Sequence, residues 1–262
     1  MNRTRARGAA LLALLAMVMI VVSVSFVASV SLNKQRTEKS SRNLSQLHAA
    51  KEALLGYALR QSAPGLLPCP DANGDGFANP GGSSCSRQLG YLPYKTLQLD
   101  DLRDGSGAKL WYAVELSYAV ETPGTELNPS LASSLRLNTT EVVAAVVLAP
   151  GPPIGNQQRT NNNADRYLEG VNANGTTTTY ALAKDETNND ELLGIDAGEF
   201  WTTIERYVLY SLGQRLIAYH DTPNCDEYPW AAQNTAPYNS DAGREAGQLP
   251  SGNAIPFNGA AG

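Results

Sequence analysis

Residues Ala9–Leu32 read AALLALLAMVMIVVSVSFVASVSL, a run of apolar and small residues that contains no charge. About 20 apolar residues in a helix, each advancing it by about 1.5 Å, cross the ~30 Å hydrocarbon core of a bilayer. The apolar region of a secretory signal peptide is shorter, at about 7 to 15 residues. The run therefore predicts a single transmembrane helix over residues 9–32.

The segment before this run is short and basic, and it reads MNRTRARG from Met1 to Gly8. Its alternating arginines, the glycine and the following Ala-Ala-Leu-Leu resemble the leader of type IV pilins and type II secretion pseudopilins. The resemblance implies a leader over residues 1–8, cleavage between Gly8 and Ala9 by a prepilin peptidase, and methylation of the new N-terminus. The alternatives are a plain signal anchor and a signal peptide cut near residues 28–31, where small residues cluster.

One residue departs from the pattern of the major pilins. Their fifth residue after the cut is a glutamate, whereas here it is Ala13. An ionised carboxylate in lipid is costly unless it is paired, so a subunit with no neighbour above it can omit the group. The departure therefore favours a minor or tip-like subunit over a bulk one.

The segment 33–61 is predicted to continue the helix beyond the membrane. Leu44, Leu47, Ala50, Leu54 and Ala58 recur at helical spacing, and the following Pro-Gly sequence provides a stop. Together with the span, this segment forms a rod of about 50 residues and about 75 Å. Such a rod matches the spine of a pilin subunit, and a juxtamembrane linker helix is the alternative.

The chain beyond the membrane, residues 33–262, is expected to form one periplasmic globular domain. Leu-Pro-Cys-Pro-Asp at 67–71 and Trp-Tyr-Ala-Val at 111–114 are similar to sequences of uncharacterised bacterial prepilin-like proteins. The resemblance implies an α+β, pilin-like fold, in which the second half of the long helix packs on an antiparallel sheet.

Further elements follow from composition and periodicity. Residues 109–120 and 141–149 read as strands, and the second is so uniformly apolar that it should be central. An amphipathic helix is expected at 198–220, with Asp196 as its N-cap. The segment 150–190 is rich in Asn, Thr, Gly and Pro and predicts a surface loop insertion, and the polar tail 231–262 is expected to be poorly ordered.

The chain has three cysteines. Cys69 and Cys85 are close in sequence, whereas Cys225 stands apart. A cross-link that closes a loop of about 15 residues stabilises the fold by roughly 3 kcal/mol in the entropic model. We predict a Cys69–Cys85 disulfide, with free thiols or metal ligation as alternatives. Oxidation implies a periplasmic domain held at the inner membrane by a single span, or a place in an external filament.

Oxygen-bearing residues lie between the two cysteines, at positions one, three, five and nine of an EF-hand-type loop, and position seven offers a carbonyl. The candidate Ca²⁺ ligands are Asp71, Asn73, Asp75, Phe77 and Asn79. The glutamate expected at position twelve is replaced by Gly82. The pattern predicts either a weak calcium site or Asx turns without a metal.

Other function classes find little support in the sequence. A net charge of −5 with no basic stretch past the membrane-proximal segment argues against nucleic acid as a partner. His48 and His220 are the only histidines, and no nucleophile elbow, zinc motif or phosphate loop is present. No enzymatic activity is expected, although acidic residues leave a paired-carboxylate glycosidase open: Asp100, Asp101, Asp104, Glu115 and Glu121.

These observations predict a structural, minor pilin- or pseudopilin-like subunit of a type II secretion or type IV pilus-like filament. Its partners would be other pilin or pseudopilin subunits, a prepilin peptidase and the inner membrane. The alternative is a membrane-anchored periplasmic module that binds calcium or a protein and does not assemble.

Overall fold

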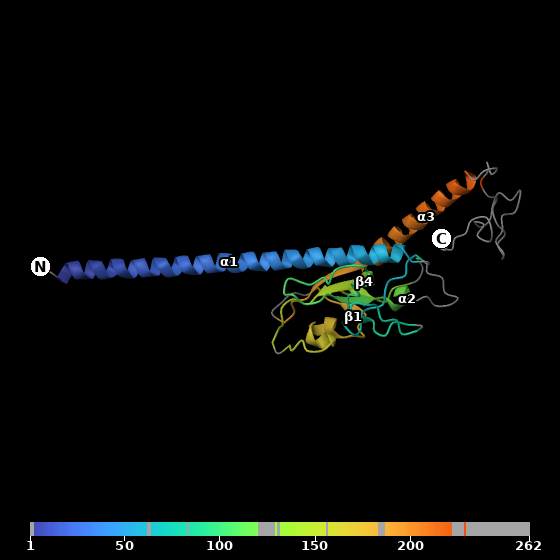
Figure 1. Cartoon of the computed structure of the whole chain (residues 1–262). Coiled ribbons are helices and arrows are strands. Elements are labelled where there is room, and N and C mark those ends of the chain that lie inside the picture. Colours follow the sequence, from blue (N-terminus) through green and yellow to red (C-terminus); the bar gives the residue numbers. More distant parts are fainter. Residues whose placement is uncertain are drawn as a thin grey trace.

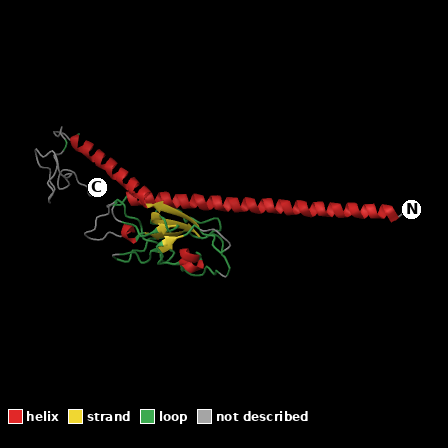
Figure 2. Cartoon of the chain, turned by 180° about the vertical axis from the view of Figure 1, so that it is seen from behind, coloured by secondary structure: helices red, strands yellow, loops and turns green. Residues whose placement is uncertain are grey.

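The computed structural model is an α+β structure in which one long helix runs past a small body and a second helix leaves that body (Figure 1). The N-terminal half of the long helix extends away from the body, and its C-terminal half lies over the strands (Figure 2). The structure describes residues 3–61, 64–82, 84–119, 129, 132–155, 157–182, 187–221 and 228.

The long helix, α1, spans Arg3–Leu59, so the expected continuation of the helix through residues 33–59 is present. Its predicted apolar face is confirmed from Leu47 onward, because Leu47, Ala50, Leu54 and Ala58 are all buried, but Leu44 is exposed and lies outside the packed part of the helix. The chain then turns at Gly65, which has a φ of 109°, a value that glycine adopts more easily than other residues. Its amide donates to the Ala58 carbonyl at 3.0 Å.

Six strands form the sheet, in the order β1-β2-β4-β3-β5 with β6 on the other side of β4. Their bounds are β1 Leu89–Tyr91, β2 Trp111–Val114, β3 Arg136–Leu137, β4 Glu141–Ala149, β5 Thr179–Tyr180 and β6 Glu191–Asp196. The strand expected at 109–120 is shorter than predicted, because helix α2, Leu116–Ala119, follows β2 almost at once.

The sheet is mixed, so the expectation of an antiparallel sheet is wrong in one pairing. β3 runs parallel to β5, with Arg136 opposite Thr179 and Leu137 opposite Tyr180. A parallel pair needs a long connection to bring the chain back in the same direction, and the stretch between β3 and β5 supplies it. All other strand pairs are antiparallel.

β4 lies at the centre of the sheet, as its composition predicted. Both faces of the sheet are also covered. Tyr112 of β2 and Val147 of β4 point into the core beneath α1 and α3. The neighbouring Trp111 and Leu148 point into a second core on the opposite face. A strand buried on both sides has no polar face, which explains the apolar run from Val143 to Ala149.

The second face is covered by the segment that was predicted to be a surface insertion. Within it lie two short 3₁₀ turns, Ala164–Arg166 and Gly170–Ala173. Leu168 and Tyr180 are buried, so part of this polar segment packs against the sheet and only the remainder is exposed loop. Its few apolar side chains are sufficient to complete the second core.

Helix α3 spans Ala197–His220, and its predicted N-cap is confirmed by the Asp196 carboxylate, which accepts from the Glu199 amide at 2.9 Å. Phe200, Trp201 and Ile204 are buried under α1 and the sheet. Past these turns the helix projects from the body (Figure 1), so the apolar side expected along its whole length is buried only at its start.

Candidate functional site

The N-terminal half of α1 exposes an almost continuous apolar surface. Ser23 and Ser25 interrupt it, and their hydroxyls donate to the Met19 and Val21 carbonyls of the same helix at 2.7 and 2.8 Å. Such bonds satisfy polar groups without water or a partner chain. The exposed large apolar side chains are Leu14, Leu15, Met17, Val18, Met19, Ile20, Val21, Val22, Val24 and Phe26.

Among the residues that the structure describes, no helix carries an apolar segment that meets the length needed to cross a bilayer. The predicted span 9–32 includes residues 9–13 and 27–32, whose side chains lie outside the described set. The same holds for the side chains at the predicted cleavage site, Gly8 and Ala9, which both belong to α1. The predicted tail 231–262 also lies outside the described residues.

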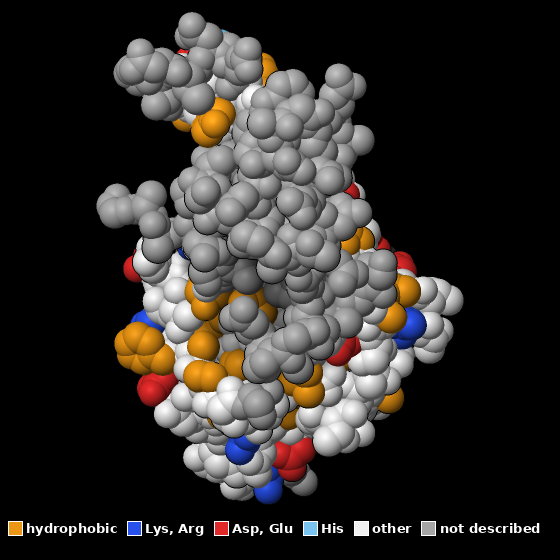
Figure 3. Space-filling model, turned by 90° about the vertical axis from the view of Figure 1, so that its right-hand side faces the viewer, with side chains coloured by type: hydrophobic (Ala, Val, Ile, Leu, Met, Phe, Trp, Pro, Cys, Tyr) orange, Lys and Arg blue, Asp and Glu red, His pale blue; other side chains and the backbone are white. Residues whose placement is uncertain are grey.

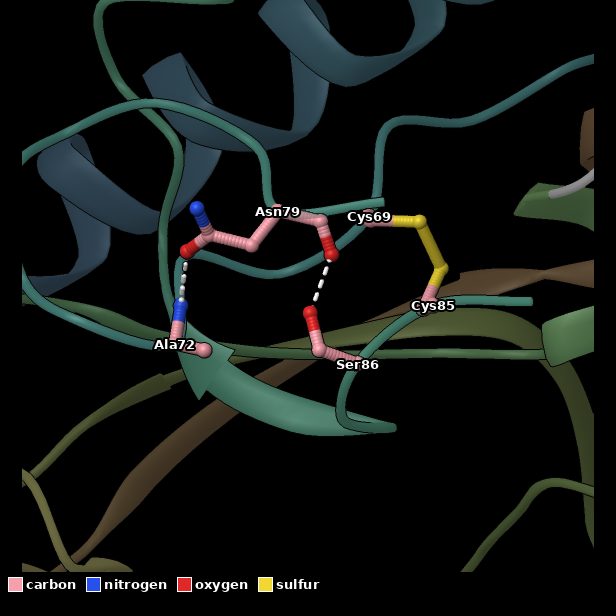
Figure 4. Close-up of a disulfide and its surroundings, with 5 residues drawn as sticks. All are labelled: Cys69, Ala72, Asn79, Cys85 and Ser86. Atoms are coloured by element: carbon pink, nitrogen blue, oxygen red, sulfur yellow. Dashed lines mark hydrogen bonds between the residues drawn. A yellow bond between two sulfur atoms is a disulfide. The ribbon is translucent and has the colours of Figure 1, made fainter. Parts of the chain in front are cut away.

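The predicted disulfide is present. Cys69 and Cys85 are joined, with their Cα atoms 5.3 Å apart and both side chains buried. Asn79 links the two sides of the closed loop (Figure 4), since its side-chain oxygen accepts from the Ala72 amide at 2.6 Å and its carbonyl accepts from Ser86. Cys225 lies outside the described residues.

The candidate calcium ligands form a chain of Asx turns within this loop. The buried Asp71 carboxylate accepts from the amides of Asn73, Gly74 and Gly76 at 3.1, 2.6 and 2.7 Å. The Asn73 side-chain oxygen accepts from the Asp75 amide at 3.1 Å, and Asp75 accepts from the Phe77 amide at 2.8 Å. Each side chain thus bonds the backbone two or more residues further on, as Asx turns do.

Two lysines from distant parts of the chain complete the loop. Lys95 donates to the Asp75 carbonyl and lies 4.9 Å from the Phe77 ring centre, and Lys109 donates to the Gly74 carbonyl at 2.6 Å. Hydrogen bonds from the Phe77 amide and the Asn73 side chain hold the pKa of Asp75 below its ordinary value. The lysines lie 20 and 35 residues from their acceptors, so the motif itself gave no signal of them.

The structure brings the predicted ligands together in a series of Asx turns. The side-chain oxygens of Asp71, Asn73, Asp75 and Asn79 accept hydrogen bonds from protein N–H groups. Within the described part of the chain, no group of three or more His, Cys, Asp or Glu side chains is placed to hold a metal ion. Asp101, further along the chain, is paired with Arg103.

Two of the carboxylates that left a glycosidase open, Asp104 and Glu115, serve as hydrogen-bond acceptors in the fold. Asp104 is fully buried and accepts from the amides of Ala108 and Gly151, each at 2.8 Å. Glu115 accepts from Ser133 and Ser134; burial raises the pKa of Glu115, but these hydrogen bonds outweigh it and the pKa lies below its ordinary value. Glu121 lies outside the described residues.

A buried pair of acidic residues was not predicted from the sequence. The Asp190 carboxylate accepts from the Glu169 amide at 3.2 Å and from the Asn172 side chain at 3.1 Å, while its second oxygen meets no donor among the described residues. The pKa of Asp190 is raised to about 7, mainly by burial and to a smaller extent by the charge of Glu169. Neither residue lies in a motif, and their proximity depends on how the insertion folds back.

A second exposed apolar surface lies on the projecting part of α3. Figure 3 looks onto the end of the body from which α3 leaves, and hydrophobic side chains are visible on this face. Solvent-exposed apolar clusters on a soluble body commonly mark contact sites. On α3 the exposed apolar side chains are Tyr207, Val208, Leu209, Tyr210 and Ile217.

Comparisons with protein-family models, with curated proteins and with solved structures find no match to this chain.

Proposed function

We propose that this chain is a minor, tip-like structural subunit of a type II secretion or type IV pilus-like filament, with a pilin-like fold. The prepilin peptidase would remove residues 1–8, and the N-terminal half of α1 would anchor the subunit in the inner membrane. The body would then lie in the periplasm or on the filament.

The observation that carries the proposal is the division of α1 into two halves of opposite character. Along Leu47–Ala58 the helix buries one apolar face against the sheet. Along Leu14–Phe26 it exposes large apolar side chains on all sides. A helix that is apolar all round requires an apolar environment, either lipid or the matching helices of neighbouring subunits.

Two further features support a periplasmic, assembling subunit. A disulfide between Cys69 and Cys85 fits an oxidising compartment. The apolar side chains on the projecting part of α3, among them Leu209 and Tyr210, offer a surface to neighbouring subunits in addition to α1. Aromatic residues such as Tyr210 are enriched at protein interfaces.

A cross-linking experiment separates this proposal from a membrane-anchored binding module that does not assemble. A photo-reactive amino acid is placed at Tyr210, in cells that produce the chain with a prepilin peptidase and pilin-like subunits. We expect adducts with those subunits, because Tyr210 is 67% exposed on the proposed contact face.

The control carries the same amino acid at Thr178, which is exposed but does not belong to α3, and it should give fewer adducts. Gly8→Val, which blocks cleavage after the glycine, should remove the adducts at Tyr210. Adducts with no pilin-like subunit from either position would favour the non-assembling module.

A further inference from the structure

A pocket of about 580 Å³ lies beside the disulfide-closed loop. The loop residues Asn73 and Gly74 form one wall, the turn from Arg103 to Lys109 forms a second, and the segment 159–167 closes it. Ligand pockets of small molecules commonly have volumes of about 300–1,000 Å³. The three walls come from distant parts of the chain, so no local motif marks this site.

The pocket is basic although the chain is acidic overall. Its lining contains Arg103, Lys109 and Arg159 and no Asp or Glu, whereas the whole protein has a net charge of −5. Arg103 is neutralised by Asp101 and also donates to the Gly107 carbonyl at 3.0 Å. Neither Lys109 nor Arg159 forms a salt bridge within the described residues.

Arg159 is the residue whose hydrogen-bonding capacity is least satisfied. Its guanidinium lies 5.3 Å from the centre of the Tyr167 ring, which holds it in place. The Nε and Nη2 atoms are shielded from solvent, and neither meets an acceptor in the part of the chain that the structure describes. A shielded donor without a partner costs free energy, so a movement of the Arg159 side chain that brings these donors to an oxyanion in the pocket would recover that loss.

The geometry of the basic groups favours an oxyanion over other ligands. A guanidinium offers paired N–H groups that match the oxygens of a carboxylate or a phosphate. Lys109 adds a second positive charge, and its Nζ lies 5.5 Å from the Tyr91 ring centre. Both residues line a pocket whose lining contains no carboxylate.

The volume and the remaining lining define the rest of the ligand. A pocket of this size is much larger than a single carboxylate or phosphate, so it has room for a larger molecule that carries the anionic group. Amide and hydroxyl groups of Ser106, Thr160, Asn161 and Asn162 line the walls and can exchange hydrogen bonds with several hydroxyls. We infer that the pocket binds an acidic saccharide, whose carboxylate or phosphate pairs with Arg159 and Lys109.

Fluorescence titration of the whole chain in detergent tests this inference. Trp111 reports on the site, because its ring lies 4.4 Å from Tyr91 and 5.4 Å from Tyr167, which both line the pocket. The probes are glucuronate for a carboxylate, glucose 6-phosphate for a phosphate, and glucose as the neutral sugar. We expect at least one acidic sugar to bind about tenfold more tightly than glucose, a difference of about 1.4 kcal/mol.

Variants identify the groups responsible. Arg159→Gln should weaken binding of the acidic sugar by about tenfold and reduce its dependence on salt. Lys109→Gln should act in the same direction and serves as the second variant if Arg159→Gln does not fold. Arg166→Gln is the matched control, since Arg166 is paired with Asp165 outside the pocket and its loss should leave binding unchanged.

The inference would be overturned if neither acidic sugar bound at about 10 mM, or if glucose bound as tightly as the acidic sugars. It would also be overturned if both pocket variants bound the acidic sugar with unchanged affinity. Binding of inorganic phosphate without any acidic sugar would also overturn it, because the saccharide is part of the claim. None of these results depends on cleavage or assembly, so they leave the proposed filament function untouched.

Discussion

Among the glycines of the disulfide-closed loop, Gly76 is the one at which an added Cβ would meet the closest contact. Its φ is 90°, and a Cβ there would lie 2.6 Å from the Tyr94 ring. Gly76→Ala should therefore lower the free energy of unfolding by about 1–3 kcal/mol, through backbone strain together with the displaced ring. Denaturant unfolding of the whole chain in detergent measures this loss.

Gly82→Ala is the matched control in the same loop. Gly82 has a similar φ of 85°, but a Cβ there would meet nothing within 4 Å. Its substitution should cost only the backbone strain, and therefore less than Gly76→Ala. Equal losses at the two positions would show that the contact with Tyr94 does not matter.

Asp190 should make the stability of the fold depend on pH. Its pKa is raised to about 7 in the folded chain from an ordinary 3.8, so the folded state binds the proton more tightly than the unfolded state. Its stabilising contribution is complete below about pH 4 and is lost as the pH rises to about 7. The free energy of unfolding should fall over this window by at least about 1 kcal/mol, because one pKa unit corresponds to about 1.4 kcal/mol.

Thermal melting between pH 4 and pH 8 compares the wild-type chain with Asp190→Asn, which keeps the shape of the side chain but cannot ionise. We expect a flatter pH dependence in this variant. Asp165→Asn is the control, because Asp165 is exposed and should follow the wild type. An unchanged slope in Asp190→Asn would assign the pH dependence to other groups.

At the scale of elements, the sequence predicted best where a pattern is repeated along one segment. The bounds of β4 follow from its uninterrupted apolar run, and the start of α3 follows from Asp196 and the apolar residues after it. The disulfide could be predicted because its two cysteines are neighbours in the chain. In each case the information lies within about 20 residues.

Elements whose stability depends on distant partners were missed. β6 was not predicted, since Gly194 interrupts its apolar pattern; a Cβ at Gly194 would lie 3.0 Å from Val143 of β4. The polar composition of 150–190 likewise concealed the burial of Leu168 and Tyr180. Composition cannot show that a few apolar side chains of a loop meet an open sheet face.

The same limit applies to the candidate sites. The Asx residues of the loop could be identified because they recur at fixed spacing, but their lysine partners could not. The basic pocket combines Lys109 with Arg159, fifty residues later in the numbering and on a different segment. Single cations in unrelated segments give no signal until the fold brings them together.

For the loop from Asp71 to Asn79, a calcium site and metal-free Asx turns predict different responses to calcium. Its side-chain oxygens already accept hydrogen bonds, and the ammonium groups of Lys95 and Lys109 bind its carbonyls. We therefore expect the same melting temperature in EDTA and in millimolar calcium. A rise in melting temperature with calcium, through binding to the folded state only, would instead support a weak site.

Asp75→Ala distinguishes the two cases further. Asp75 is on the outside of the loop, so its loss should leave the disulfide and the core intact. If calcium stabilises the wild-type chain, this variant should lose the effect.

At the scale of the whole molecule, the chain combines a well-packed body with two apolar surfaces that the other described residues leave exposed. The sheet has a core on each face, and the Lys51–Glu199 ion pair, at 2.6 Å, joins the packed half of α1 to the start of α3. The N-terminal half of α1 and the outer part of α3 both leave this body (Figure 1). The packed body and the two exposed helical segments are therefore separate features of the molecule.

The mature N-terminus tests the proposed filament subunit most directly. The chain is produced with and without a prepilin peptidase, and intact mass with N-terminal sequencing identifies its first residue. Gly8→Val, in which the small residue before the cut is lost, is the matched control and should stay unprocessed. We predict a chain that begins at Ala9 and carries an N-terminal methyl group only when the peptidase is present; a chain that begins near Val30, or that keeps residues 1–8 beside an active peptidase, would contradict the pilin-like account.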